Sequence, residues 1–175
     1  KRAPDEGVVG TLMSNFGLEK AFDDLNIPFK RSKVGDRYVA EMLNETGWVL
    51  GGESSGHIIC RGFTTTGDGI VAALQILSIL SQQAGSLSAL AGQLQKCPQV
   101  LINVKLNGSS GDPLNNAQVL ESVTAAETAL EGSGRVLLRK SGTEPLVRVM
   151  VEGIDGALVQ SLAENIAGVV ENEVG

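Results

Sequence analysis

The chain has 175 residues, 42% of them hydrophobic and 19% charged, with a formal net charge of -6. This composition supplies enough apolar surface for one or two folded cores and excludes a disordered chain. The negative charge disfavours loose binding to nucleic acid or to an anionic membrane, which needs a field of Lys and Arg. Any bound phosphate must therefore be held by a few local groups.

The sequence also excludes several classes of site. No run of about 18 apolar residues is present, and residues 1–7 lack the apolar core of a secretion signal, so we expect a cytoplasmic protein. Cys60 and Cys97 stand outside any metal-binding spacing, and we expect both to be small buried residues. His57 is the only histidine, and the carboxylates show no ligand spacing, so no metal site is predicted in this chain.

The first 67 residues alternate strand-like runs with helical patterns, which is typical of a layered α/β domain. Strands are predicted near 8–13, 29–34, 48–51 and 57–60, and helices near 15–27 and 36–46. No βα unit stands before the first strand. We therefore expect a piece of this domain to lie upstream of the sequence.

Residues 68–95 are interpreted as connecting helices. The preceding loop, residues 64–69, is rich in small residues, ends in a helix cap and is expected to act as a hinge. A long helix from residue 70 to Gly85 has a broad apolar face, which suggests burial between two bodies. A shorter helix is predicted over 87–94.

Residues 96–175 have a pattern of their own, β-α-β-β-α. Strands are predicted at 100–106, 136–140 and 146–152, and helices at 119–130 and from 155 onward. This order favours an α+β domain with an antiparallel sheet covered by two helices. The predicted fold class is therefore a partial α/β domain followed by an α+β domain.

The segment 139–148 carries two guanidinium groups, two hydroxyls and a glycine turn between adjoining strands. The forks of Arg139 and Arg148 match pairs of phosphate oxygens, while Ser141, Thr143 and the backbone at Gly142 can donate further bonds. The segment is not a nucleotide P-loop, because its glycine follows the lysine. Chemistry alone leaves an ordinary hairpin with solvated charges equally open.

A second polar segment is the loop 51–57, Gly-Gly-Glu-Ser-Ser-Gly-His. Glu53, Ser55 and His57 stand at alternate positions on a glycine-flanked loop and can converge on sugar hydroxyls. The alternative is a tight loop between two strands with a structural histidine. A Ser/His/Glu hydrolase is disfavoured because the loop lacks the GxSxG elbow.

At these two loops the chain resembles the α-D-phosphohexomutases. Residues 52–57 match their GExSGH sugar-binding loop, and residues 139–145 match their RxSGTEP phosphate-binding loop. Residues 9–15 and 33–38 resemble most the branch that interconverts glucosamine 6-phosphate and glucosamine 1-phosphate. The branch that acts on mannose and glucose phosphates is the alternative, and residues 1–6 have no counterpart.

The resemblance implies a four-domain isomerase that transfers a phosphoryl group within its substrate. Residues 1–67 would be part of the third domain, and residues 96–175 would be the fourth. A phosphoserine in the first domain and Mg²⁺ in the second would act through a bisphosphate intermediate. Neither motif occurs in this sequence, so we expect no catalytic residue here, not even Ser141, and an inactive chain that needs the missing domains as partners.

The resemblance also assigns binding roles by position. The residues expected to hold the sugar are Glu53, Ser55, Gly56, His57 and Lys33. Those expected to hold the non-reacting phosphate are Arg139, Ser141, Gly142, Thr143 and Arg148. Together they would hold one phosphorylated amino-hexose, although Lys33 is equally explained as a solvated charge.

Two alternatives from other classes stay open. The first is a non-catalytic module that binds phosphosugars, and the second is an unrelated two-domain protein that binds anions. The sheet edge left by the missing βα unit further predicts self-association of the chain.

Overall fold

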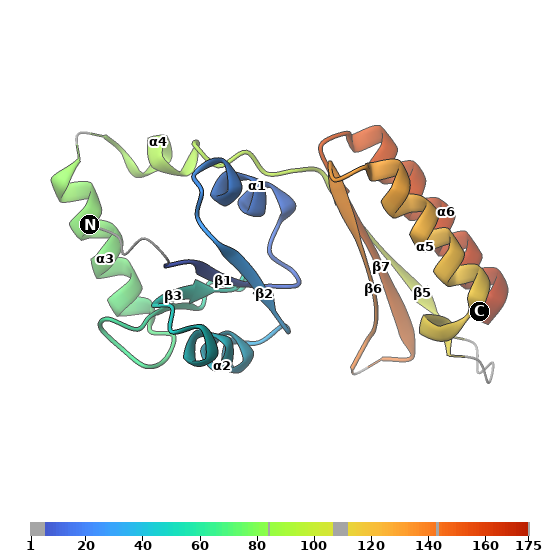
Figure 1. Cartoon of the computed structure of the whole chain (residues 1–175), viewed down its shortest axis with the longest axis horizontal. Coiled ribbons are helices and arrows are strands. Elements are labelled where there is room, and N and C mark those ends of the chain that lie inside the picture. The colour runs from blue at the N-terminus through green and yellow to red at the C-terminus, as the bar shows by residue number, and fades with distance from the viewer. Residues whose placement is uncertain (1–5, 84, 107–111, 143, 175) are drawn as a thin grey trace. The chain divides into compact units, whose positions relative to one another are not determined.

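The computed structural model describes residues 6–83, 85–106, 112–142 and 144–174. The chain divides into two compact units, residues 1–95 and 96–175, each with its own sheet (Figure 1). An α/β unit is followed by a β-α-β-β-α unit, which confirms the predicted fold class. Among the described residues, no helix is long and apolar enough to cross a membrane.

The first unit is built on a four-stranded sheet in the order β2-β1-β3-β4. Its strands are β1 (Val8–Thr11), β2 (Phe29–Ser32), β3 (Leu50–Gly52) and β4 (Ile58–Cys60). The first three are parallel, and β4 runs antiparallel to β3. The carboxyl ends of the three parallel strands therefore share one edge, which is where open α/β sheets bind ligands.

Two helices connect the parallel strands and cover opposite faces of the sheet, α1 (Phe16–Asp24) and α2 (Asp36–Thr46) (Figure 1). The side chain of Asn15 caps α1 by accepting a hydrogen bond from the Gly17 amide at 3.0 Å. Gly47 ends α2 with a φ of 71°, a conformation that favours glycine. The buried core of this unit lies between α2 and the sheet and comprises Val9, Val39, Leu43 and Ile59.

Two further helices follow β4, α3 (Gly69–Gln82) and α4 (Leu87–Ala91). The carboxylate of Asp68 caps α3, as the sequence predicted. The predicted burial of the apolar face of α3 was wrong for this chain, since Ile70, Leu74 and Leu77 are 75%, 56% and 59% exposed. The helix packs chiefly against the short edge strand β4, which can cover only part of it.

The second unit is a three-stranded antiparallel sheet in the order β5-β7-β6 with helices on one face (Figure 1). Its elements are β5 (Gln99–Lys105), the 3-10 turn η1 (Pro113–Asn115), α5 (Ala117–Leu130), β6 (Gly134–Lys140), β7 (Leu146–Gly153) and α6 (Gly156–Val174). The turn predicted at 108–113 lies largely outside the described residues.

Alternation along β7 decides what each face of this sheet carries. Val147, Val149 and Val151 are fully buried in the core beneath α5 and α6. Arg148 lies between them in sequence and therefore projects from the opposite face. Both cysteines, predicted to be buried, are only half-buried.

Candidate functional site

Residues 53–57 close a tight hairpin between β3 and β4 at the carboxyl edge of the first sheet. The amide of Glu53 donates to the carbonyl of His57, and the amide of Gly56 donates to the carbonyl of Glu53, both at 3.0 Å. Gly56 has a φ of 98°, which favours glycine at this position. The hairpin brings together Glu53, Ser55 and His57, three of the residues predicted to bind sugar.

The Glu53 carboxylate organises this hairpin. Its Oε1 accepts a hydrogen bond from the Ser55 hydroxyl at 2.7 Å and lies 2.9 Å from Nδ1 of His57. Its Oε2 accepts from the amide of Gly35 at 3.2 Å. The Glu53 side chain is 10% exposed and that of His57 is 58% exposed, so the imidazole presents the network to solvent.

These hydrogen bonds also set the ionisation of the carboxyl group. The Ser55 hydroxyl, and next the His57 imidazole, lower the pKa of Glu53, and the Gly35 amide adds to this effect. Partial burial acts in the opposite direction. Glu53 is therefore a carboxylate at neutral pH and acts only as a hydrogen-bond acceptor.

Lys33 follows β2 at the same edge but takes no part in the Glu53 network within the described residues. Its ammonium lies over the ring of Tyr38, 5.7 Å from the centroid. The guanidinium of Arg37 lies 6.0 Å from the same centroid. Lys33 thus lies at the same edge of the sheet as the predicted sugar-binding loop, residues 52–57, and no described contact joins it to that loop.

The sequence analysis did not identify two residues that hold loops at the carboxyl edge of the first sheet. Gly35 donates to Glu53, as described above. Arg31 donates from Nη1 to the carbonyls of Thr11 and Ser14, which fixes the loop after β1, and it pairs with Glu19 at 2.7 Å. The useful signals were a glycine directly before a helix and an arginine inside a parallel strand.

The loop 141–145 joins β6 to β7 in the second unit. Arg139 and Arg148 are direct cross-strand partners at its base. The amide of Ser141 donates to the carbonyl of Leu146 at 2.9 Å, and β5 is tied to the loop through Pro145, whose carbonyl accepts from the Leu106 amide at 2.8 Å. The two arginines predicted to bind phosphate are therefore held together by a rigid ladder.

The charges of this pair are poorly compensated. Nη2 of Arg148 lies 3.7 Å from the Glu144 carboxylate, and its buried Nε has no hydrogen-bond partner among the described residues. Burial lowers the pKa of Arg139, and the nearby charge of Arg148 lowers it further. Two close cations and an unused buried donor favour an anionic ligand.

The other predicted phosphate ligands lie in the loop itself. Ser141 is half-buried and Gly142 is exposed, with open space around it. Thr143 lies outside the described residues. Lys140, which precedes the loop and was not predicted to bind phosphate, forms an ion pair with Asp112 at 2.9 Å. That contact lowers the pKa of Asp112 and connects the end of β6 to the residue before η1.

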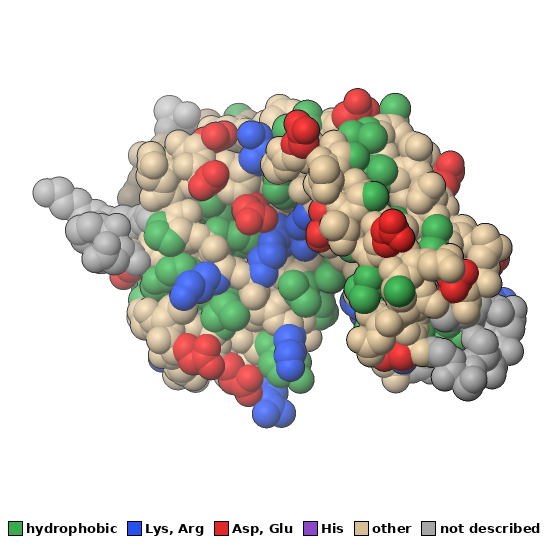
Figure 2. All heavy atoms as spheres, turned by 45° about the vertical axis from the view of Figure 1, so that its right-hand side comes forward, with side chains coloured by type: hydrophobic (Ala, Val, Ile, Leu, Met, Phe, Trp, Pro, Cys, Tyr) green, Lys and Arg blue, Asp and Glu red, His purple; other side chains and the backbone are tan. Residues whose placement is uncertain are grey.

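No metal site was predicted in this chain. The described residues contain no group of three His, Cys, Asp or Glu side chains that could hold a metal ion. Hard cations such as Mg²⁺ need several oxygen ligands, so this part of the chain does not fit one. On the face seen in Figure 2, most of the visible Lys and Arg side chains lie over the first unit, whereas the charged side chains visible on the second unit are chiefly acidic.

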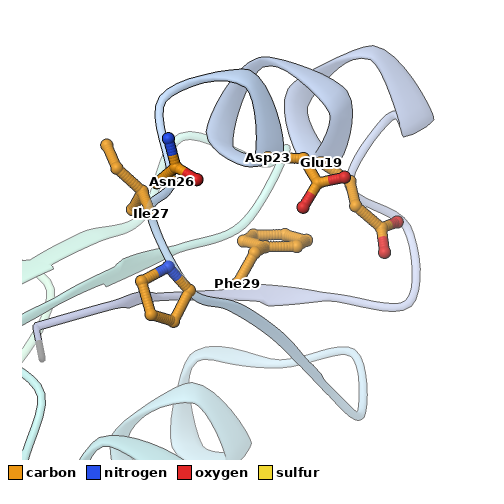
Figure 3. Close-up of a pocket in the computed structure, with 6 residues that line it drawn as sticks. Glu19, Asp23, Asn26, Ile27 and Phe29 are labelled. Atoms are coloured by element: carbon orange, nitrogen blue, oxygen red, sulfur yellow. The ribbon is translucent and has the colours of Figure 1, made fainter.

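One cavity of about 320 Å³ is lined by none of the residues predicted to bind sugar or phosphate (Figure 3). It is lined by Glu19, Asp23, Asn26, Ile27, Pro28 and Phe29. These residues belong to α1, to the loop 25–28 and to the start of β2, at the edge of the sheet opposite to the predicted sugar-binding loop. The stacked rings of Phe22 and Phe29 lie in the same region.

Comparison with known families identifies both units. Residues 1–97 match the family model "Phosphoglucomutase/phosphomannomutase, alpha/beta/alpha domain III", and residues 101–169 match the C-terminal domain of the same family. The chain belongs to the phosphoglucomutase/phosphomannomutase family. Its two units correspond to the third domain and the C-terminal domain of that family.

The chain is also similar to individual enzymes of known name. The chain is 59% identical over 165 residues to a phosphoglucosamine mutase of Erwinia tasmaniensis and 57% identical over 164 residues to phosphoglucosamine mutase 2 of Shewanella amazonensis. These matches cover 94% of the chain but only 37% and 36% of those relatives. The chain thus spans little more than a third of their length.

Two solved structures share the fold of the chain. N-acetylphosphoglucosamine mutase of Aspergillus fumigatus matches 96% of the chain and 38% of its own with a TM-score of 0.80 at 17% identity. A further structure of that enzyme, with GlcNAc-6P and magnesium, has a TM-score of 0.73 at 18% identity and covers 98% of the chain and 39% of its own. At such identities the likeness establishes the fold alone.

Proposed function

We propose that the chain is the sugar- and phosphate-binding part of a phosphoglucosamine mutase, a cytoplasmic enzyme that interconverts glucosamine 6-phosphate and glucosamine 1-phosphate. The identities of 57–59% to phosphoglucosamine mutases support this branch. The observation that carries the binding role is the cross-strand pair of Arg139 and Arg148. The buried Nε of Arg148 has no hydrogen-bond partner among the described residues, and the pair stands at the base of the loop 141–145.

The loop at the second sheet anchors the phosphate that does not react. Arg139 and Arg148 supply two charged forks, and Ser141, Gly142 and Thr143 supply hydroxyl and backbone donors. A mutase that phosphorylates either end of a hexose must hold the other end each time. Binding energy at this remote phosphate positions the reacting end and so contributes to the rate.

The loop at the first sheet holds sugar hydroxyls. His57 and Ser55 are exposed polar groups of this loop, Glu53 supports them through hydrogen bonds, and Gly56 permits the turn. Lys33 stands close by and supplies a positive charge at the same edge of the sheet. Both loops serve the same phosphorylated amino-hexose.

The chemical step requires residues that this chain does not contain. We assign the phosphoserine and the Mg²⁺ ligands to the remaining domains of the parent enzyme, and the reaction runs through a bisphosphate intermediate. Mg²⁺ supplies charge neutralisation at the transferred phosphoryl group. By itself the chain binds phosphosugar and has no mutase activity.

Two measurements test this proposal. The parent enzyme should convert glucosamine 6-phosphate faster than glucose or mannose 6-phosphate, and the reverse order would assign it to another branch. Adding glucosamine 6-phosphate to the 175-residue chain should shift the amide signals of Ser141 and Gly142. No shift at millimolar ligand would contradict the binding role.

A further inference from the structure

The Glu53 carboxylate joins two segments that are far apart in sequence. Oε1 accepts from Ser55 and His57 within its own hairpin, while Oε2 accepts from the amide of Gly35 in the loop after β2. Gly35 and Glu53 are 18 residues apart in the sequence, and the hydrogen bond between them spans the carboxyl edge of the sheet. The sugar loop is therefore held by a neighbouring loop as well as by its own strands.

The loop after β2 is built to offer that amide. Ser32 ends β2 with its hydroxyl donating to the Gly10 carbonyl at 3.1 Å, which fixes the entry into the loop. Gly35 has a φ of 125°, and its carbonyl accepts from the Tyr38 amide at 3.0 Å as α2 begins. Its own N–H therefore sits at the positive end of a helix, where a carboxylate is stabilised.

The effect of this contact is transmitted to His57. When Nδ1 of a neutral imidazole donates to a carboxylate, Nε2 carries the lone pair and accepts hydrogen bonds. Glu53 is 10% exposed and its two oxygens already accept three hydrogen bonds, whereas the imidazole is 58% exposed. The group that reaches a ligand is thus His57, and Glu53 determines its orientation and tautomer.

We propose that Gly35 is a positioning residue of the sugar site: its backbone N–H holds the Glu53 carboxylate, which keeps His57 as the Nδ1–H tautomer with Nε2 facing a sugar hydroxyl. The nature of the ligand at Nε2 rests on the proposed function. We call the hydrogen bond from the Gly35 N–H to the Glu53 carboxylate the tether, and it depends only on the geometry of the first unit. Gly35 touches no substrate in this scheme and acts through Glu53.

The test uses nitrogen-15 spectra of the imidazole, which report the tautomer. His57 is the only histidine of the chain, so its signals are unambiguous. In Gly35→Ala the positive φ disfavours alanine and the amide moves away from Glu53, so the Nδ1–H tautomer should give way to a mixture. Gly47→Ala is the control: it also places alanine at a positive φ, here 71°, but at the other end of α2.

The outcomes separate clearly. A tautomer change in Gly35→Ala with none in Gly47→Ala supports the tether. An unchanged His57 spectrum in Gly35→Ala, or an equal change in both variants, overturns it. Should Gly35→Ala fail to fold, amide exchange gives the answer: in Glu53→Ala the Gly35 N–H should exchange about tenfold faster than in the wild type, and an unchanged rate overturns the proposal.

Adding glucosamine 6-phosphate to the wild-type chain distinguishes this inference from the proposed function. A tautomer effect without ligand binding upholds the tether and contradicts the binding role. Ligand binding without a tautomer effect upholds the binding role and overturns the tether.

Discussion

Arg139 on β6 and Arg148 on β7 are direct cross-strand partners, so two guanidinium groups share one face of the second sheet. Like charges directly opposite one another destabilise a sheet. The only ion pair that the described residues offer to either of these two arginines is the long contact of 3.7 Å from Arg148 to Glu144. An anion bound between the arginines would relieve this repulsion.

Replacement of either arginine should weaken binding without weakening the fold. We expect Arg148→Met and Arg139→Met each to reduce affinity for glucosamine 6-phosphate by about 10- to 100-fold, because a charged hydrogen bond contributes about 1.5–3 kcal/mol. The free energy of unfolding should stay within about 0.5 kcal/mol or rise, as the repulsion is removed. Calorimetric titration and urea unfolding measure the two effects, and Lys96→Met, an exposed cation elsewhere in the unit, should change neither.

The Glu53 network predicts a pH-dependent contribution to stability. The pKa of Glu53 is lower in the folded chain than in the unfolded chain, chiefly through the Ser55 and His57 hydrogen bonds. Its contribution is therefore present above about pH 4.3, the ordinary glutamate pKa, and is lost as the pH falls through the lower folded value. The stability difference between wild type and Glu53→Gln should shrink as the pH falls from 7 to about 3; a constant difference in urea unfolding would argue against the network.

The pair of Arg135 and Glu152 should dominate the electrostatic stability of the second unit. Glu152 is fully buried, and its Oε1 accepts from Nε of Arg135 at 2.5 Å. Arg135→Ala should destabilise the fold by about 3–5 kcal/mol, because it takes the positive charge of the Arg135 guanidinium away from a fully buried carboxylate. The double variant Arg135→Met with Glu152→Leu should recover most of this loss. A single variant as stable as wild type in urea would refute the expectation.

The exposed face of α3 should make copies of the chain associate. Ile70, Leu74 and Leu77 form one apolar stripe, and among the described residues β2 has a strand neighbour on one side only. Light scattering should show a mass above 18.2 kDa that rises with concentration. Leu74→Glu with Leu77→Glu should lower this mass, whereas Leu120→Glu, an exposed position on α5, should not. A single species of 18.2 kDa at every concentration would refute this prediction.

Local signals along the chain predicted much of this fold. The helix expected at 36–46 has those bounds in the structure, since Gly35 and Gly47 mark both ends. The two polar loops lie between the strands expected to flank them. The predicted burial of α3 was wrong. An apolar helix face indicates that another surface packs against it, but it does not show whether that surface belongs to the same chain.

The residue types and their spacing determined by themselves the order of strands and helices, both chemically distinctive loops and the family to which they belong. These properties follow from backbone preferences and side-chain periodicity, which act over a few residues. Only the tertiary structure decided that Gly35 reaches Glu53, that Arg139 opposes Arg148 and that Lys140 turns to Asp112. Such contacts depend on strand register and sheet order, which arise from packing between segments far apart in the sequence.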